Sequence, residues 1–203
     1  MLQTQSVNPE LLELLNKIMQ DSAFNKFLLV GGTSLALQIG HRISVDIDLF
    51  GEQELNEPEL SSIINKFGKS TLLNSSPNVL VYEINGIKLD IVNYPYPWLG
   101  LPLIEGNLRL AQFSDIGAMK LNAIAGRGSK KDFIDLFFLL KIFTLSELMK
   151  AYLKKYSNGS EFLVLKSLSY FDDADQEPSP KMIVPITWKE IKSKLINEIK
   201  KYQ

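Results

Sequence analysis

The chain has 203 residues, of which 45% are hydrophobic and 22% charged, a balance typical of a globular protein rather than a disordered one. It contains no cysteine, which excludes disulfides, thiolate metal sites and a cysteine nucleophile, and neither a secretory signal nor an apolar stretch long enough to span a bilayer is expected. The net charge of −1 divides unevenly, because residues 1–112 carry 7 Lys or Arg against 12 Asp or Glu, whereas residues 113–203 carry 15 against 11.

The first half of the chain mixes helical and extended patterns. Helices are predicted over residues 9–19, 33–39 and 57–67, the first with Asn8 as its N-cap. Strands are predicted over residues 27–30, 44–50, 79–84 and 87–93. The last two flank Asn85-Gly86, a strong hairpin signal. The proline- and glycine-containing residues 94–106 predict a linker.

The second half is predicted to be helical. The helices are expected over residues 114–125, 131–143, 146–156, 161–170 and 188–201, with a polar loop over residues 172–180. We therefore predict an α/β (α+β) fold with two domains. Residues 1–112 would form an α/β core with a small mixed sheet flanked by helices, and residues 113–203 a helical region.

Two acidic residues share one face of a predicted strand. Asp46 and Asp48 lie two residues apart, so their side chains project from the same side. Neighbouring carboxylates repel each other, and ionising both on a buried face is costly without a cation. Carboxylate oxygens at this spacing suit Mg²⁺, which completes its coordination with phosphates and water. An ordinary half-exposed strand is the alternative interpretation of this pair.

A glycine pair separates the preceding strand from the next helix. Gly31 and Gly32 would let backbone N–H groups approach a ligand closely, and the helix N-terminus adds partial positive charge. Thr33 and Ser34 could add hydroxyl donors. The sequence predicts a phosphate cradle thirteen residues before Asp46, although a tight strand-to-helix turn also favours glycine.

A third carboxylate interrupts the apolar run of the second hairpin strand. Asp90 lies between Leu89 and Ile91. If this strand neighbours the strand of Asp46 and Asp48, three carboxylates converge. Three are sufficient for two metal ions, one holding a triphosphate and one activating an attacking hydroxyl. We expect a two-metal Mg²⁺ site at these three residues, with Mn²⁺ as a possible substitute.

These motifs resemble a known signature. Val30–Gly32 followed by Asp46–Leu49 resembles the nucleotidyltransferase fold of the DNA polymerase β superfamily. The longer string VGGTSLALQIGHRISVDIDLF resembles the AbiEii/AbiGii toxin-like nucleotidyltransferases of bacterial abortive-infection and type IV toxin–antitoxin systems. A later segment, KLNAIAGRGSKKDFIDL, is similar to the downstream motif of this branch. The resemblance covers about residues 25–140.

The resemblance implies a fold, an activity and a set of site residues. The helical region would close over the nucleotide, which would be transferred from a nucleoside triphosphate with release of pyrophosphate. Catalytic roles would fall to Asp46, Asp48, Asp90, Lys120, Asp132 and Asp135, the first three as metal ligands. Nucleotide contacts would fall to Gly31, Gly32, Thr33, Ser34, Arg42, Lys120 and Arg127.

The downstream residues allow two interpretations. Lys120 and Arg127 lie seven residues apart on a predicted helix, and Asp132 and Asp135 share a face of the next. A cation near the phosphates would stabilise charge that develops during transfer, and one aspartate would act as a base or as a lysine positioner. A set of salt bridges between the helices is the alternative. For His41, the only histidine, structural support or a nucleotide contact is favoured over catalysis.

The predicted protein is a cytoplasmic, Mg²⁺-dependent nucleotidyltransferase that acts as a toxin on RNA, with tRNA as the expected acceptor. Its expected partners are a nucleoside triphosphate and a cognate antitoxin encoded nearby. No association with a membrane is expected. The net positive charge of the second half favours RNA as the acceptor. The alternative explanation of the uneven charge is that each half simply has an ordinary solvated surface. The alternatives are nucleotide transfer to a protein or a small molecule such as an antibiotic, and a catalytically silent nucleotide-binding or interaction protein.

Overall fold

The computed structural model describes residues 1–202, so Gln203, the end of the predicted second domain, lies outside the described residues. The chain forms two compact units. The first comprises Met1–Gly40, Ser44–Tyr96 and Pro102–Ala111, and the second comprises His41–Ile43, Pro97–Leu101 and the chain from Gln112 onward. This division differs from a single boundary after residue 112 in Gln112 and in two short segments, His41–Ile43 and Pro97–Leu101, all of which belong to the second unit.

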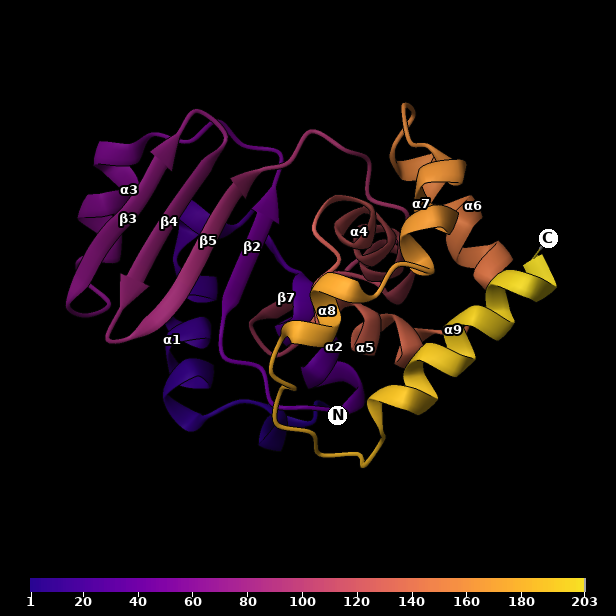
Figure 1. Cartoon of the computed structure of the whole chain (residues 1–203). Helices are drawn as coiled ribbons and strands as arrows, with labels where there is room; N and C mark the ends of the chain where they lie inside the picture. Colours follow the sequence, from indigo (N-terminus) through magenta and orange to yellow (C-terminus); the bar gives the residue numbers. More distant parts are fainter. Residues whose placement is uncertain (203) are drawn as a thin grey trace. The chain divides into compact units, whose positions relative to one another are not determined.

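The first unit is built on a seven-stranded mixed sheet (Figure 1). Its strands are β1 (Leu28–Leu29), β2 (Ile47–Gly51), β3 (Ser70–Ser76), β4 (Val79–Ile84), β5 (Ile87–Asn93), β6 (Leu103–Glu105) and β7 (Leu108–Leu110). They follow the order β3-β4-β5-β2-β1-β7-β6. β2 pairs in parallel with β5, and β1 with β7, whereas the other neighbours are antiparallel. The prediction of a mixed sheet flanked by helices is confirmed.

Helices and 3-10 turns complete the first unit. They are η1 (Thr4–Ser6), α1 (Pro9–Gln20), η2 (Ser22–Phe24), α2 (Gly31–Ile39) and α3 (Glu57–Ile64). α1 begins as predicted, because the Asn8 side chain accepts a hydrogen bond of 2.8 Å from the Leu11 N–H. The apolar residues of α1 and α3 share one core with Ile47, Leu49 and other alternate strand residues. This alternation leaves the opposite sheet face for polar side chains.

The hairpin prediction is confirmed, whereas the expected linker is partly wrong. Asn85 and Gly86 both have positive φ angles, 51° and 82°, as a two-residue turn between β4 and β5 requires. β6 lies inside the expected linker 94–106 and pairs with β7. The edge strand β3 was not expected, because its sequence STLLNSS is rich in serine and asparagine; its pairing with β4 gives it an extended conformation.

The second unit is helical. Its helices are α4 (Phe113–Gly126), α5 (Lys130–Leu139), α6 (Leu145–Lys155), α7 (Glu161–Leu168), α8 (Asp172–Gln176) and α9 (Trp188–Tyr202). α4 contacts α5, α6 and α7. The short helix α8 corrects the predicted loop over 172–180, since one turn of helix leaves little periodic signal. Of the helices within residues 1–202, none combines the length and apolar character that crossing a bilayer requires.

A buried ion pair explains why Pro97–Leu101 packs with the second unit. Lys155 Nζ lies 2.7 Å from an Asp115 carboxylate oxygen, and both side chains are fully buried. Lys155 also donates to the Pro97 carbonyl at 2.8 Å, and the Leu99 N–H donates to Asp115 at 3.0 Å. The segment is therefore held to α4 and α6 through its backbone.

Candidate active site

The parallel pairing of β2 with β5 brings two of the predicted carboxylates together. Asp48 and Asp90 are partners in register, as are their neighbours Ile47 and Leu89. Because side chains alternate along a strand, the two aspartates lie on one face and the fully buried Ile47 and Leu89 on the other. The condition considered from the sequence, that the Asp90 strand neighbours the Asp48 strand, is therefore met.

Asp90 has one paired and one unpaired oxygen. Lys88 Nζ lies 2.7 Å from Asp90 Oδ2, and the two residues are two apart on β5. Asp90 Oδ1 is buried and has no hydrogen-bond partner in the part of the chain that the structure describes. Sequence reasoning missed Lys88, although the same period of two that groups Asp46 with Asp48 also groups Lys88 with Asp90.

Asp46 precedes β2, which begins at Ile47, and is half-buried. Within residues 1–202, no three His, Cys, Asp or Glu side chains lie close enough together to form a ready metal site. The structure therefore shows the Asp48–Asp90 pair, while the third ligand, Asp46, stays a prediction.

The glycine turn approaches the carboxylate pair. Gly31 has φ +67°, and a Cβ at this position would overlap with the Asp48 Oδ2 atom. Gly31 is also the first residue of α2, whose N-cap Val30 has no side-chain oxygen to cap the helix. The first N–H groups of a helix lack carbonyl partners within it. The turn thus combines close approach with the donors and the positive dipole end that bind anions.

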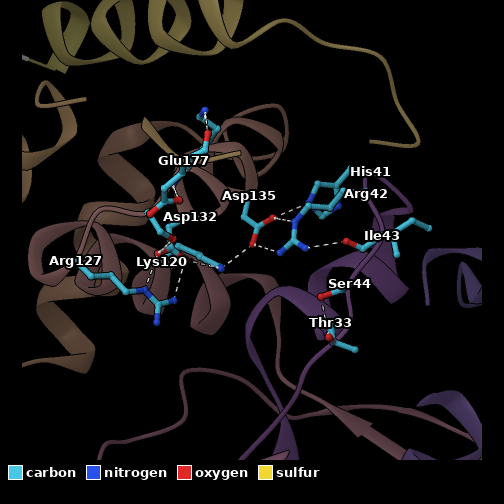
Figure 2. Close-up of polar contacts among 12 residues, drawn as sticks. Thr33, His41, Arg42, Ile43, Ser44, Lys120, Arg127, Asp132, Asp135 and Glu177 are labelled. Carbon is cyan, nitrogen blue, oxygen red and sulfur yellow. Dashed lines mark hydrogen bonds and ion pairs between the residues drawn. The ribbon is translucent and has the colours of Figure 1, made fainter. Parts of the chain in front are cut away.

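The side chains of Thr33 and Ser34 are buried, unlike those of typical phosphate ligands. Thr33 Oγ1 lies 2.9 Å from Ser44 Oγ (Figure 2) and also bonds to the Asp46 carbonyl oxygen. Ser34 Oγ accepts a hydrogen bond of 3.1 Å from Gln38. A nucleotide contact by Thr33 would therefore use its backbone N–H, whereas the Ser34 N–H already donates to the Val30 carbonyl at 3.3 Å.

The downstream motif forms a second cluster, within the second unit (Figure 2). Lys120 Nζ lies between two fully buried carboxylates, 2.9 Å from Asp132 Oδ1 and 2.6 Å from Asp135 Oδ2. Arg42 forms a two-point contact with Asp135, at 2.7 Å from Nε and 2.9 Å from Nη2. The salt-bridge set considered from the sequence is thus present, and it also includes Arg42.

Arg127 differs from the other cations because it reaches the surface. Its guanidinium bonds to Asp132 at 2.9 Å and 3.2 Å, and Ser129 donates to the same carboxylate at 2.7 Å. The Arg127 side chain is nevertheless 63% exposed, whereas Lys120 and Arg42 are buried. Of the cations in this cluster, Arg127 therefore presents the most accessible charge.

The charges of this cluster decide between the roles considered for its aspartates. Burial raises the pKa of Asp132, but the charges of Lys120 and Arg127 outweigh it and lower the pKa to about 2. Burial likewise opposes ionisation of Asp135, yet Lys120 and Arg42 hold its pKa well below the usual value. A general base needs a pKa near the working pH. Both aspartates are therefore better suited to position Lys120 than to accept a proton.

His41 supports the same cluster. Its Nε2 lies 2.7 Å from Asp135 Oδ1, and its ring lies against Phe138. The backbone of His41–Ile43 also bonds to a later segment, with Ile43 N–H donating to the Lys181 carbonyl at 2.8 Å and Ile183 N–H donating to the His41 carbonyl. This arrangement supports the structural role favoured from the sequence.

The donor set of the first unit fits a divalent cation. Asp48 and Asp90 supply hard carboxylate oxygens, and Asp90 Oδ1 is an acceptor to which no group within residues 1–202 donates. Mg²⁺ in proteins takes one or two carboxylates together with phosphate oxygens and water. The α2 N-terminus next to Asp48 is where such phosphates would lie. Asp48, Asp90 and, by prediction, Asp46 are the residues that would hold the ion.

Comparisons with known proteins give a family match and similar folds. The model of a family described as nucleotidyl transferase AbiEii toxin, type IV TA system, matches residues 13–201. An uncharacterized protein of Aquifex aeolicus (strain VF5) is 38% identical over 196 residues, which cover 94% of each chain. The fold is similar to JHP933 of Helicobacter pylori (TM-score 0.59, 19% identity, covering 94% of this chain and 88% of that one). It is also similar to MenT4, a nucleotidyltransferase toxin of Mycobacterium tuberculosis H37Rv (TM-score 0.55, 12% identity, covering 94% and 81%).

Proposed function

The chain belongs to the AbiEii nucleotidyltransferase toxin family, and on this premise we propose that it is a Mg²⁺-dependent enzyme that transfers a nucleotide to an RNA hydroxyl, with tRNA as the acceptor. The observation that carries the proposal is the position of Asp48, which lies beside Asp90 on one side and against Gly31 at the α2 N-terminus on the other. Oxygen ligands for a cation and N–H donors for phosphates therefore meet at one place.

The proposed reaction makes and breaks one bond at phosphorus. The acceptor hydroxyl oxygen bonds to the α-phosphorus of the triphosphate, and the bond from that phosphorus to the bridging oxygen breaks. Pyrophosphate leaves, and the hydroxyl proton passes to solvent. Mg²⁺, when bound, supplies Lewis-acid polarisation of the phosphates and activation of the attacking oxygen.

The residues of the chain would bind and orient the reactants. Backbone N–H groups of Gly31–Thr33 would hold the triphosphate at the positive end of α2. Asp46, Asp48 and Asp90 would hold the metal. Arg127, anchored on Asp132 and exposed, is the proposed phosphate contact of the downstream cluster.

The buried members of the downstream cluster would act by orientation. Lys120 is retained as the proposed transition-state cation, positioned by Asp132 and Asp135. Arg42 would fix Asp135 rather than contact the nucleotide, because its Nε and Nη2 atoms both bond to that carboxylate. Closure of the helical region over the nucleotide stays a prediction from the sequence.

The proposed setting is the bacterial cytoplasm, with a cognate antitoxin as partner. The toxin–antitoxin description of the family supports the partner. The absence of cysteine supports a reducing compartment. The excess of Lys and Arg over Asp and Glu in residues 113–203 supports an RNA acceptor.

A transfer assay tests the chemistry and the acceptor together. The purified protein is incubated with Mg²⁺, each of the four α-labelled nucleoside triphosphates in turn, and total RNA or whole lysate. We expect label in the tRNA band, its loss in Asp48→Asn, and no loss in Glu83→Gln, whose exposed carboxylate lies on β4, the strand beside β5. Label in protein or small molecules would refute the RNA acceptor, and equal labelling by Asp48→Asn would refute the proposed site.

A further inference from the structure

The Thr33 hydroxyl joins two parts of the first unit that carry the proposed chemistry. Thr33 lies in the first turn of α2 and is 1% exposed. Its Oγ1 lies 2.9 Å from Ser44 Oγ and bonds to the backbone carbonyl oxygen of Asp46. One side chain therefore connects the glycine turn to the segment that carries the predicted metal ligand.

The chemistry of the groups fixes the order of these hydrogen bonds. A carbonyl oxygen only accepts, and a hydroxyl carries one hydrogen. Thr33 therefore donates to the Asp46 carbonyl, and Ser44 donates to Thr33. Ser44 is itself held, because its backbone N–H donates to the Ser6 carbonyl at 2.9 Å. The result is a directed chain of hydrogen bonds from Ser44 through Thr33 to Asp46.

The bond from Thr33 restrains a residue that lies outside the strand ladder. The pairing of β2 with β5 begins at Ile47, opposite Leu89, so it does not include the backbone of Asp46. Asp48, by contrast, lies within the ladder opposite Asp90. Strand pairing thus includes Asp48, whereas the backbone carbonyl of Asp46 is bonded by a side chain from α2.

We propose that Thr33 is a positioning residue, whose hydroxyl holds Asp46 in place while its backbone N–H faces the phosphates. This inference rests on the proposed function and deepens it. It replaces the contact between the Thr33 hydroxyl and the triphosphate that the sequence suggested, since a 1% exposed hydroxyl with two partners would have to leave both partners to reach a ligand. A site is supported best when the groups that orient its ligands are themselves fixed.

The test separates metal binding from nucleotide binding. Mn²⁺ affinity is measured by electron paramagnetic resonance on the full chain with an α,β-methylene triphosphate analogue, alongside kcat and the triphosphate KM. Thr33→Val, which removes the hydroxyl and keeps the shape, should weaken Mn²⁺ binding about tenfold and lower kcat by about 10- to 100-fold, with KM within about twofold. Thr33→Ser, which keeps the hydroxyl, should restore all three values. Thr71→Val on the exposed edge strand β3 is the matched control.

Ser44→Ala provides an independent variant. It removes the hydroxyl at the other end of the same series of hydrogen bonds, so it should change Mn²⁺ affinity and kcat in the same direction as Thr33→Val, but less. The double variant Thr33→Val with Ser44→Ala should lose little beyond Thr33→Val alone. If Thr33→Val does not fold, Ser44→Ala decides alone. A raised KM with unchanged kcat and Mn²⁺ affinity would overturn the positioning role in favour of a phosphate contact, and unchanged values in the variants would overturn it altogether. Absence of transfer by the unmodified protein would instead refute the proposed function.

Discussion

Asp48 on β2 lies directly beside Asp90 on β5, and Oδ1 of Asp90 is buried without a hydrogen-bond partner within residues 1–202. Like charges side by side in a sheet are destabilising, and an unsatisfied buried oxygen adds to the cost. Within the described part of the chain, Lys88 is the one ion-pair partner of this aspartate, through Oδ2. The proposed cation, when bound, would compensate both carboxylates at this place in the sheet.

Asp90→Asn should therefore reduce nucleotide transfer strongly and change the free energy of unfolding little. It removes one of two adjacent like charges together with a half-exposed ion pair, and the two effects oppose each other. We expect the free energy of unfolding in urea to stay within about 1 kcal/mol of the original value. Nucleotide transfer should fall by at least about 100-fold, because a proposed metal ligand is lost. A loss of stability of several kcal/mol would show that Asp90 is mainly a structural residue.

Asp135→Asn, by contrast, should lower the free energy of unfolding strongly. Asp135 is fully buried between Lys120, Arg42 and His41, so its removal leaves two buried cations without their main counter-charge. Breaking such a pair costs about 3–5 kcal/mol. Urea unfolding should show this loss, whereas Glu13→Gln, which breaks an exposed pair with Lys17, should leave the unfolding curve almost unchanged. Equal small losses would show that the buried network contributes little to stability.

Local pattern made much of the first unit predictable. The period of two places Asp90 opposite the core residues of its strand, and the Asn85-Gly86 turn fixes the hairpin. The place of β5 beside β2 agrees with what the family resemblance implies. The Gly31 turn was also predictable, although the particular neighbour that requires glycine there, Asp48, became visible only in the structure.

Contacts between distant parts of the chain were not predictable from one sequence. His41 and Asp135 are 94 positions apart, and no local period relates them. The Thr33–Ser44 bond is closer in sequence but depends on how α2 returns to the segment before β2. Spacing reports which side chains share a face of one element, whereas these pairs depend on tertiary packing.

Gly31→Ala tests the close approach of the turn. A Cβ there would overlap with Asp48 Oδ2, and φ is +67°. Gly106→Ala is the matched control, because Gly106 has φ +58° but open space around its Cβ position. Both variants should lose about 1–2 kcal/mol from the left-handed conformation, and Gly31→Ala should lose more and also reduce transfer. Equal losses in urea unfolding with full transfer by Gly31→Ala would contradict this account.

Stability should decrease in acid because of the buried aspartates. The pKa of Asp132 is lowered from 3.8 to about 2. A lowered carboxyl pKa stabilises the folded state above the unfolded-state value, and this contribution is lost as the pH falls through the folded-state value. For Asp132 the window runs from about pH 4 to pH 2, and the contribution is on the order of 2 kcal/mol. Urea unfolding across this window should show a steeper loss in the original chain than in Asp132→Asn; parallel curves would contradict it.

The protonation state of the single histidine, His41, reports on the charges of the buried cluster. Burial lowers the pKa of His41 below 6.5, and Arg42 and Lys120 oppose the partial compensation by Asp135. Because ionised Asp135 only accepts, the neutral ring carries its hydrogen on Nε2, which leaves Nδ1 without a partner within the described residues. Nitrogen NMR of the ring should show this tautomer at pH 6.5, with protonation only at lower pH. The chain unfolded in urea is the reference and should titrate near 6.5. A folded-state pKa at or above that reference would mean that Asp135 binds a charged imidazolium, and the charges assigned to the cluster would have to be revised.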